Sequence, residues 1–384
     1  MQGNNAMEKR IPTVFMRGGT SKGLFFKGAD LPNDFAERNQ LFLSALGSPD
    51  PFSRQLNGMG GGTSSLSKII IVNRSARDDA DVEYTHAQVS VDKPIVDYGA
   101  NCGNLSSAVG PFAVDEKMVV AEDGTVLVRL YNTNSRKIIH ARFSVRQGRV
   151  VTHGDYEIPG VSGTGAKICM DYLDPGGSAN RGLLPSGRII DEVQLEASQR
   201  IRVSLVDASI PVVFVRAADL GLRGTELPET IEQDARLMSV LDQIRRTGGV
   251  LMGLGTSPEI IGLAVPKVAL VACNESYRAL DNRTIQSSEF DIAARVISVE
   301  RVHLAVPMTV AMCLAVAMQI EGTIPNTLGA AQTKPTRIGH PSGVFPVDAS
   351  VEKSNGEWKA TKATIFQTAR RLMEGMVWVP DNNK

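Results

Sequence analysis

The chain has 384 residues and a mass of 41.3 kDa, enough for two or three domains at roughly 100–200 residues each. Its 41 basic and 41 acidic residues give zero net charge, which argues against a nucleic-acid-binding protein, because such proteins usually carry a basic excess. Aromatic residues make up only 5% of the chain, so we expect a core of aliphatic residues.

The beginning of the chain and its cysteines predict a cytoplasmic protein. Residues 1–10 lack the apolar stretch of a secretory signal, and we expect a flexible leader there. The longest apolar run, 304–318, is shorter than the roughly 20 residues of a membrane span and contains Pro307, so it predicts a buried helix. The four cysteines form no zinc-finger or C-x-x-C pattern, which argues against a metal site and a disulfide framework.

The first half of the chain predicts a hairpin, two helices and several strands. Apolar residues on both sides of loop 17–23 indicate two strands joined by a glycine-rich turn. Residues 34–46 have the period of an amphipathic helix. A second glycine- and serine-rich loop, 58–67, leads into an apolar strand that starts at Lys68, and a small-residue helix is expected over 105–114. Further strands are expected at 83–91, 125–131, 137–145 and 147–152.

The second half repeats this pattern loosely after a segment rich in glycine, proline and serine, 174–187, which is the best candidate for a domain boundary. The chain therefore predicts two similar α/β lobes, 11–185 and 186–365, with 366–384 as a candidate to complete the first. A cleft between two such lobes is a usual place for a small-molecule site. The second half is expected to contain a helix at 230–246, the apolar helix at 304–318 and strands at 192–195, 200–205, 212–216, 267–272, 344–351 and 358–367.

The two glycine-rich loops do not fit a nucleotide-binding pattern. Neither G-x-x-x-x-G-K-[ST] nor a G-x-G-x-x-G between strand and helix is present. Tight turns would explain the glycines but not the hydroxyl and cationic side chains beside them. Backbone N–H groups next to such side chains make a receptor for carboxylate or phosphate. The candidates are Arg17, Thr20, Ser21, Lys22, Thr63, Ser64, Ser65 and Ser67.

Cys102 and Lys68 are the candidate reactive side chains. Most cysteines are buried hydrophobic residues, and the apolar neighbours of Cys169, Cys273 and Cys313 predict that role. Cys102 instead lies just before a predicted helix, whose N-terminus would favour a thiolate. Lys68 would be partly desolvated between a polar loop and four apolar residues, which favours a neutral amine that can act as a base, although a lysine beside a strand is usually a solvated charge.

The histidines do not support hydrolase chemistry. None of the five lies near a G-x-S-x-G serine. His340, in a turn rich in glycine, is a candidate polar contact, whereas His86 and His140 lie in predicted strands and are expected to be structural.

Four motifs, taken together and in this order, resemble one family. They are MRGGTSKG at 16–23, GMGGGTSSLSK at 58–68, NCGN at 101–104 and GHPSG at 339–343. From about residue 11 to about 380 the chain is similar to the 2-methylaconitate cis–trans isomerase (PrpF) family, with its relatives the 4-oxalomesaconate tautomerases and methylitaconate isomerases. The resemblance implies the α/β fold of diaminopimelate epimerase, in which two pseudo-symmetric lobes each curl a mixed sheet around a central helix and the active site lies in the cleft between them. It implies that the protein needs no cofactor and no metal and that its partner is a small-molecule polycarboxylate substrate. Whether the chain forms a homodimer is left open.

The resemblance also implies roles for single residues. The family's catalytic lysine and cysteine correspond to Lys68 and Cys102. The start of the second apolar helix has no cysteine, and Cys313 lies too deep in that helix, so a lysine and cysteine pair acting on an allylic system is favoured over a racemase with two thiols. The residues implied to bind substrate are Arg17, Gly19, Thr20, Ser21, Ser64, Ser65, Asn101, Gly103, Asn104, Met308, His340 and Ser342.

We therefore expect an isomerase that works without a cofactor and moves a proton across three carbons of an unsaturated di- or tricarboxylate, such as 4-oxalomesaconate, 2-methylaconitate or aconitate. Double-bond migration and cis–trans isomerisation are both open, as is the order in which Lys68 and Cys102 act. One alternative is an amino-acid-type epimerase with the same fold. The other is a non-catalytic accessory protein that binds polycarboxylates.

Overall fold

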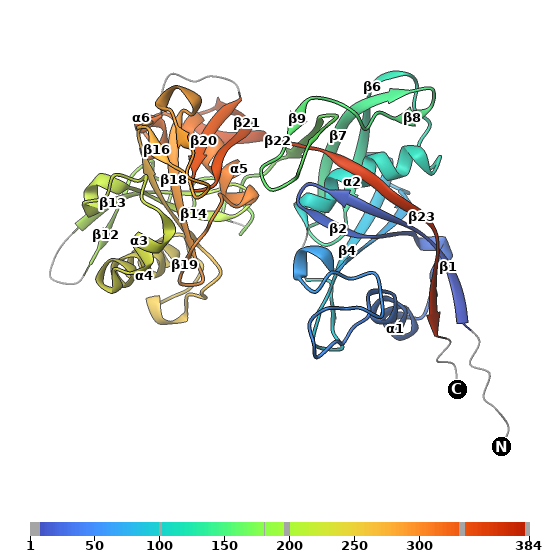
Figure 1. The fold of residues 1–384 in the computed structure, drawn as a ribbon. Coiled ribbons are helices and arrows are strands. Elements are labelled where there is room, and N and C mark those ends of the chain that lie inside the picture. Colours follow the sequence, from blue (N-terminus) through green and yellow to red (C-terminus); the bar gives the residue numbers. More distant parts are fainter. Residues whose placement is uncertain (1–7, 100–101, 180, 196–199, 330–334, 381–384) are drawn as a thin grey trace. The chain divides into compact units, whose positions relative to one another are not determined.

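The chain divides into two units, each built on a mixed β-sheet with an apolar helix packed on it (Figure 1). The computed structural model describes residues 8–99, 102–179, 181–195, 200–329 and 335–380. Unit 1 consists of Met1–Asp171 and Phe366–Lys384, and unit 2 consists of Tyr172–Ile365.

The glycine- and proline-rich segment 174–187, which composition marks as a boundary, lies inside unit 2. The chain leaves unit 1 already at Asp171. Within the segment, the N–H of Gly177 donates to the carbonyl oxygen of Asp207 at 2.8 Å, which joins it to the end of a strand of unit 2. The described residues of this segment therefore belong to unit 2 rather than to a linker between the units.

Unit 1 has a sheet in the order β23–β1–β2–β3–β4–β6–β7, in which β2 is parallel to β3, β4 is parallel to β6, and the other neighbours are antiparallel. Residues 8–10 belong to β1 rather than to the expected leader, and residues 1–7 lie outside the described part of the chain. The elements of unit 1 are α1 (Phe35–Leu46), α2 (Gly103–Asp115), β1 (Glu8–Gly18), β2 (Ser21–Lys27), β3 (Lys68–Arg74), β4 (Val82–Val89), β5 (Val96–Asp97), β6 (Gly124–Asn132), β7 (Lys137–Arg146), β8 (Arg149–Val150), β9 (Tyr156–Glu157), β10 (Thr164–Gly165) and β23 (Ala369–Pro380). The strands β11 (Ile168–Leu173) and β22 (Glu357–Gln367) cross the unit boundary.

Unit 2 repeats the same order and directions as β12–β13–β14–β15–β18–β20–β21, with β14 parallel to β15 and β18 parallel to β20. The predicted pair of similar lobes is thus confirmed as a repeat of topology. The elements of unit 2 are α3 (Pro228–Glu232), α4 (Ala235–Leu251), α5 (Met308–Gln319), α6 (Ile324–Leu328), β12 (Asp191–Gln194), β13 (Arg200–Asp207), β14 (Pro211–Arg216), β15 (Lys267–Ala272), β16 (Tyr277–Arg278), β17 (Thr284–Ile285), β18 (Ile292–Ser298), β19 (Arg301–Val302), β20 (Thr336–His340) and β21 (Gly343–Ser354).

The same arginine–aspartate clamp joins the second parallel strand pair of each unit. In unit 1 the backbone N–H of Arg129 donates to Asp81 Oδ2 at 2.7 Å, and its guanidinium donates to Asp81 Oδ1 at 2.6 Å. In unit 2 the N–H of Arg337 donates to Asp291 Oδ2 at 2.7 Å, and its guanidinium to Asp291 Oδ1 at 2.6 Å. In each unit one carboxylate accepts two hydrogen bonds from the same arginine, one at each oxygen. This arrangement holds the two parallel strands in the same geometry in both units.

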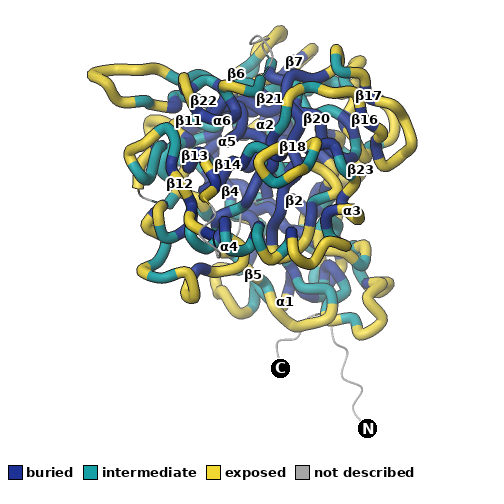
Figure 2. The backbone as a smooth tube through the Cα atoms, turned by 90° about the vertical axis from the view of Figure 1, so that its left-hand side faces the viewer, coloured by how far each residue is buried: buried dark blue, intermediate teal, exposed yellow. Residues whose placement is uncertain are grey.

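The helices α2 and α5 supply the centre of each unit's core, where the tube is dark blue (Figure 2). Small residues let α2 approach its sheet closely: a Cβ atom at Gly110 would lie 2.7 Å from the ring of Phe143. In α5 every residue from Val310 to Met318 is buried, which explains its unbroken apolar sequence.

Two helix boundaries differ from the predictions for local reasons. The helix expected at 230–246 is interrupted, and α4 starts afresh after Asp234, whose carboxylate accepts from the N–H of Leu237 at 2.9 Å as an N-cap. The helix expected at 304–318 starts only after Pro307, because the residue before a proline avoids helical backbone angles.

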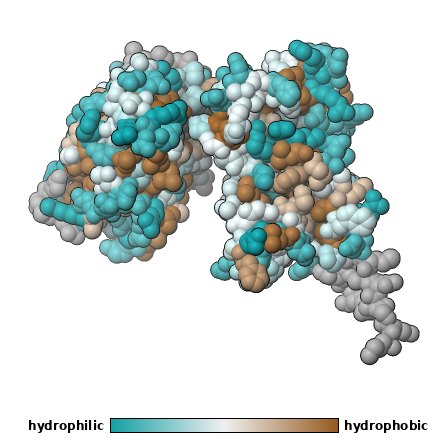
Figure 3. All heavy atoms as spheres, viewed as in Figure 1, coloured by the Kyte–Doolittle hydropathy of each residue, from teal (hydrophilic) through white to brown (hydrophobic). Residues whose placement is uncertain are grey.

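The last strand, β23, is not predicted from the sequence, although it pairs with β1 along its whole length. Its residues do not alternate between buried and exposed, since Leu372, Met373 and Met376 all face solvent at least in part. Exposed Trp378 is covered by the guanidinium of Arg10, 5.0 Å from the ring centroid. Figure 3 shows brown hydrophobic side chains among teal hydrophilic ones on the displayed face of unit 1.

No helix in the described part of the chain is both long enough and apolar enough to span a bilayer.

The two clamps should differ in how much they stabilise the protein. The side chain of Asp291 is 3% exposed and that of Asp81 is 26% exposed. Arg337→Met, which removes the guanidinium that neutralises this buried carboxylate but keeps the backbone hydrogen bond, should lower the free energy of unfolding by about 3 kcal/mol. Arg129→Met should cost about 1 kcal/mol, because water can solvate Asp81. Urea unfolding of both variants checks this, and equal losses would contradict it.

Candidate active site

The turn between β1 and β2 lies against the first turn of α2. A Cβ atom at Gly18 would lie 2.7 Å from the carbonyl oxygen of Asn104, so only glycine permits this approach. Gly19 has a φ of +50°, in the left-handed region that glycine favours. The predicted contact residues Gly19, Thr20 and Ser21 are therefore held directly beside the helix.

Arg17 fixes this turn to the last strand of the chain. Its guanidinium donates to the carbonyl oxygens of Gly19 (3.0 Å) and Thr368 (3.1 Å) and to the hydroxyl of Thr368 (2.9 Å). Arg370 lies opposite Arg17 in the β1–β23 pairing, and burial followed by this second cation lowers the pKa of Arg17. The guanidinium still carries its charge at neutral pH. Arg17 thus positions the turn and contributes positive charge.

Cys102 is the N-cap of α2 and directs its thiol toward the hairpin. Its Sγ lies 3.9 Å from the hydroxyl oxygen of Ser21, and the residue is 8% exposed. The Cys102 side chain makes no capping bond to the helix, whereas its carbonyl oxygen accepts from the N–H and the hydroxyl of Ser106. The thiol is thus placed at the positive end of the helix without being used as a cap.

Two other residues of the NCGN motif are described. Gly103 is the first residue of α2, and the amide of Asn104 donates to the hydroxyl of Thr20 at 3.0 Å, which joins the helix to the turn. Asn101, which the family resemblance implies to bind substrate, lies outside the described residues.

Lys68 is the first residue of β3 and is buried, with 9% exposed. Its ammonium group donates to Oε1 of Gln88, its register partner on β4, at 2.5 Å. The amide nitrogen of Gln88 donates to the carbonyl oxygens of Ser64 (3.1 Å), Ser67 (3.0 Å) and Val89 (3.3 Å). These three acceptors fix the orientation of the amide, so its oxygen must face Lys68. Within the described part of the chain no carboxylate pairs with Lys68.

The loop before Lys68 is organised by Gln55, which is 1% exposed. Its amide donates to the hydroxyl of Ser48 at 2.8 Å, and its Oε1 accepts from the N–H of Gly62 (2.9 Å) and the hydroxyl of Ser67 (2.6 Å). The predicted contact residues Ser64 and Ser65 start the short 3-10 turn Ser64–Leu66 inside this loop. Gln55 therefore holds the backbone that leads into Lys68.

Strand β2 lies next to both reactive candidates. Ser21 and Gly23 are two residues apart, so they lie on the same face of the strand. Ser21 contacts Cys102, and Gly23 is the register partner of Lys68. A Cβ atom at Gly23 would lie 2.4 Å from the carbonyl oxygen of Lys68, which explains the glycine there.

Three residues that sequence reasoning missed complete this arrangement: Gln88, Gln55 and Thr368. Each is a neutral polar residue in an ordinary stretch of sequence. The pairing of β3 with β4 brings Gln88 to Lys68, the pairing of β1 with β23 brings Thr368 next to Arg17, and Gln55 reaches the loop before Lys68 through its side-chain hydrogen bonds.

The remaining predicted contact residues belong to unit 2. Met308 is the first residue of α5, and the hydroxyl of Ser342 donates to the carbonyl oxygen of Leu304 just before that helix, at 2.6 Å. His340 is 1% exposed, and its Nδ1 accepts from the N–H of Ser342 at 3.2 Å, so in unit 2 by itself this side chain braces the turn.

The prediction that the other three cysteines are buried is wrong for one of them. Cys273 follows β15 directly and is exposed, because the strand ends there, and Cys169 is only partly buried. Cys313 is buried within α5, and this burial raises the pKa of its thiol. His86 is buried in β4, as expected of a structural residue.

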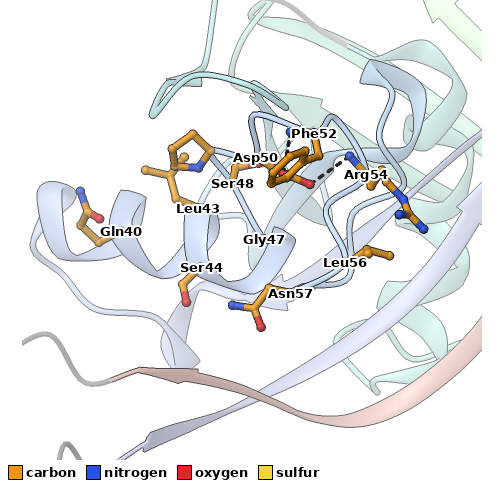
Figure 4. Close-up of a pocket in the computed structure, with 11 residues that line it drawn as sticks. Gln40, Leu43, Ser44, Gly47, Ser48, Asp50, Phe52, Arg54, Leu56 and Asn57 are labelled. Atoms are coloured by element: carbon orange, nitrogen blue, oxygen red, sulfur yellow. Dashed lines mark hydrogen bonds between the residues drawn. The ribbon is translucent and has the colours of Figure 1, made fainter.

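A pocket of about 420 Å³ lies beside α1, on the loop that follows it (Figure 4). Asp50 orders the loop by accepting from the N–H groups of Phe52 and Arg54, the two bonds drawn in the figure. None of the predicted site residues lines this pocket.

Among the described residues, no group of three or more His, Cys, Asp or Glu side chains is arranged to hold a metal ion.

Residues 8–380 match the family model described as PrpF protein. The chain belongs to the PrpF family. The resemblance seen in the four motifs is thereby confirmed.

Relatives of this PrpF-family chain are isomerases and a tautomerase. It is 39% identical over 378 residues to the 3-methylitaconate isomerase of Eubacterium barkeri, covering 97% of this chain and 98% of that protein. It is 36% identical over 385 residues to the 2-methyl-aconitate isomerase of Cupriavidus necator, covering 97% of each. It is 36% identical over 375 residues to the 4-oxalomesaconate tautomerase of Pseudomonas putida, again covering 97% of each. These relatives confirm the predicted enzyme class, an isomerase.

The fold of this PrpF-family chain is shared with a solved structure. The crystal structure of a methylitaconate-delta-isomerase matches it with a TM-score of 0.91 at 38% identity, over 97% of this chain and 96% of that one. The predicted fold class is therefore confirmed.

The buried histidine of unit 2 predicts a loss of stability in acid. Burial, and then the positive charge of Arg295, lowers the pKa of His340 to about 4. The unfolded state therefore binds a proton that the folded state does not, and stability falls as the pH drops from about 6.5 to about 4, by up to about 3 kcal/mol. In His340→Asn, which keeps an acceptor for Ser342, this part of the pH dependence should disappear. Urea unfolding at several pH values measures it, with exposed His153→Asn as the control; identical profiles for His340→Asn and wild type would refute the assignment.

Proposed function

We propose that this chain catalyses proton transfer within an unsaturated di- or tricarboxylate, with Lys68 as the base and Cys102 as its partner. The observation that carries the proposal is the buried ammonium group of Lys68, whose acceptor is the neutral amide of Gln88 rather than a carboxylate. A buried lysine without a counter-ion is suited to binding an anion.

The surroundings support a carboxylate as the bound group. The positive end of α2, the guanidinium of Arg17 and the ammonium group of Lys68 all belong to unit 1 and contribute positive charge. The hydroxyl of Ser21 and the amide of Asn104 add neutral donors beside the thiol of Cys102. Such donors stabilise the charge that develops on a substrate carboxylate when a neighbouring carbon is deprotonated.

In the proposed reaction, the neutral amine of Lys68 takes a proton from the carbon next to the double bond. The electron pair of that C–H bond spreads over the three-carbon unit and its carboxylate as a dienolate. The thiol of Cys102, or the protonated Lys68, then returns one proton to the same carbon or to the far one. Return to the far carbon moves the double bond, and rotation before return to the same carbon changes cis into trans. No atoms or electrons are gained or lost overall.

An epimerase of the two-thiol type has less support. Such an enzyme needs a second reactive thiol at the start of α5, and Pro307 occupies that N-cap. The thiol of Cys313 is buried inside the helix, where its raised pKa keeps it protonated.

The substrate class rests on the relatives. The three enzymes compared above are named for methylitaconate, methylaconitate and oxalomesaconate, each an unsaturated acid with more than one carboxylate. We extend that class, and no single compound within it, to this chain. Proton NMR in D₂O with 2-methylaconitate, trans-aconitate, 4-oxalomesaconate and methylitaconate tests the proposal. New alkene signals support an isomerase, exchange at a saturated stereocentre supports an epimerase, and an unchanged panel supports a binding protein.

Lys68→Met should retain the fold and lose turnover by at least about 100-fold, because methionine preserves the buried stem but can neither accept nor donate the proton. The measurement is kcat on whichever acid of the panel the wild type converts. Lys93→Met, at an exposed position of unit 1, is the matched control and should behave like the wild type. Near wild-type kcat in a folded Lys68→Met protein would overturn the assignment of the base.

Cys102 should be protected from alkylation by a bound polycarboxylate. Brief treatment with iodoacetamide, followed by peptide mass spectrometry, should show slower labelling of Cys102 when substrate is present. Exposed Cys273 is an internal control and should label at the same rate with and without substrate. Cys102→Ser should also lower kcat strongly without unfolding the protein. Equal labelling of Cys102 in both states would remove it from the site.

A further inference from the structure

Unit 2 carries a lysine at the position that Lys68 occupies in unit 1. Lys68 is the first residue of β3, which lies parallel to β2 and antiparallel to β4, with Gly23 and Gln88 as its register partners. Lys267 is the first residue of β15, which lies parallel to β14 and antiparallel to β18, with Val212 as its partner on β14.

Two independent markers support this correspondence between the units. The clamps Asp81–Arg129 and Asp291–Arg337 lie at the same strand pair of each repeat, counted from the lysine strand. The strand hairpins that follow, β4–β5 and β18–β19, each lead into the apolar helix of their unit. The two lysines are therefore topological equivalents, whatever the identity of the residues around them.

Lys267 resembles Lys68 in its bonding as well as in its position. Its ammonium group donates to the hydroxyl oxygen of Ser298, on the neighbouring strand β18, and Ser298 is 5% exposed. No carboxylate in the described ranges forms an ion pair with Lys267, and burial lowers the pKa of its ammonium group. By contrast, the ammonium groups of Lys9, Lys27 and Lys359 each pair with a carboxylate. A desolvated cation that bonds only a neutral hydroxyl has capacity left for an anion.

A buried polar atom without a partner among the described residues belongs to His303, whose imidazole feels the charge of Lys267. The Nε2 atom of His303 is buried and has no hydrogen-bond partner among the described residues. Burial, and then the charge of Lys267, lowers the pKa of His303, which favours the neutral imidazole. The residue follows β19 directly, on the way into α5. An ammonium group, the hydroxyl that accepts from it and an imidazole with an unpartnered nitrogen thus lie in the same region of unit 2.

We propose that Lys267, Ser298 and His303 form a carboxylate-binding site in unit 2. The absence of any carboxylate side chain among the three excludes a cation as the ligand. The choice of a carboxylate among anions rests on the proposed function, which makes polycarboxylates the ligands of this chain. The carboxylate comes either from the substrate itself or from a second organic anion that binds separately, and the stoichiometry of binding distinguishes these two sources.

The test is isothermal titration calorimetry of the full chain with trans-aconitate. Lys267→Met should weaken the binding that depends on this site by roughly 10- to 100-fold, the usual effect of removing one charge-assisted hydrogen bond. If one molecule binds per chain and its affinity falls, the carboxylate belongs to the substrate. If two bind and one is lost, it belongs to a separate anion. Lys267→Arg, which keeps the charge, should restore part of the affinity, and Lys359→Met, at an exposed position of the same unit, should have no effect.

A footprint provides a readout that does not depend on a folded variant. Acetylation of the wild type by acetic anhydride, read by peptide mass spectrometry, should be slower at Lys267 when trans-aconitate is present and unchanged at Lys359. If Lys267→Met does not fold, Ser298→Ala takes its place in the titration and should weaken binding by a smaller factor.

Unchanged affinity in Lys267→Met, or equal acetylation of Lys267 with and without trans-aconitate, overturns the inference. Binding of trans-aconitate without conversion of any acid in the NMR panel overturns the proposed function instead, and it leaves the Lys267 comparison valid.

Discussion

A buried ammonium group needs hydrogen-bond acceptors. The contacts around Lys68 in unit 1 provide such an acceptor and hold it in place. The acceptor is an amide oxygen, so the amide itself has to be held in one orientation, and three carbonyl oxygens hold it. Two of those carbonyls belong to the loop before Lys68, and that loop depends in turn on Gln55. A neutral acceptor leaves the positive charge available for an anion, whereas a carboxylate would neutralise it.

The repeat of topology separates what the fold needs from what each unit does with it. The clamps Asp81–Arg129 and Asp291–Arg337 have nearly the same geometry in the two units, because each joins a parallel strand pair. The residues at the start of the helices differ, with Cys102 in one unit and Pro307 in the other. The two units therefore share a backbone framework but carry different residues at equivalent positions. Such a difference is expected when two copies of one unit take different roles in the same protein.

Much of this could be predicted from the sequence, and the failures have identifiable physical causes. Lys68 and Cys102 are recognisable because each combines a reactive group with an unusual local context, a glycine-rich loop or a helix start. Gln88 and Thr368 are not, because their importance depends on strand pairing, which no local pattern reveals. The apolar residues before Cys273 predict burial, but β15 ends at Ala272, so the cysteine that follows is exposed.

The pairing of β1 with β23 also has a consequence for the order in which the protein can assemble. Arg17 binds Thr368, 351 residues later in the chain, and β23 begins immediately after Thr368. Synthesis on the ribosome releases the chain from its N-terminus, and domains generally fold as their residues emerge. The residues of unit 2 lie between these two strands, so they are all made before the turn that carries Ser21 can be secured to its last strand. The hairpin beside the catalytic candidates is therefore among the last parts of the nascent chain to reach its final structure, and a chain that stops before β23 lacks the strand that secures it.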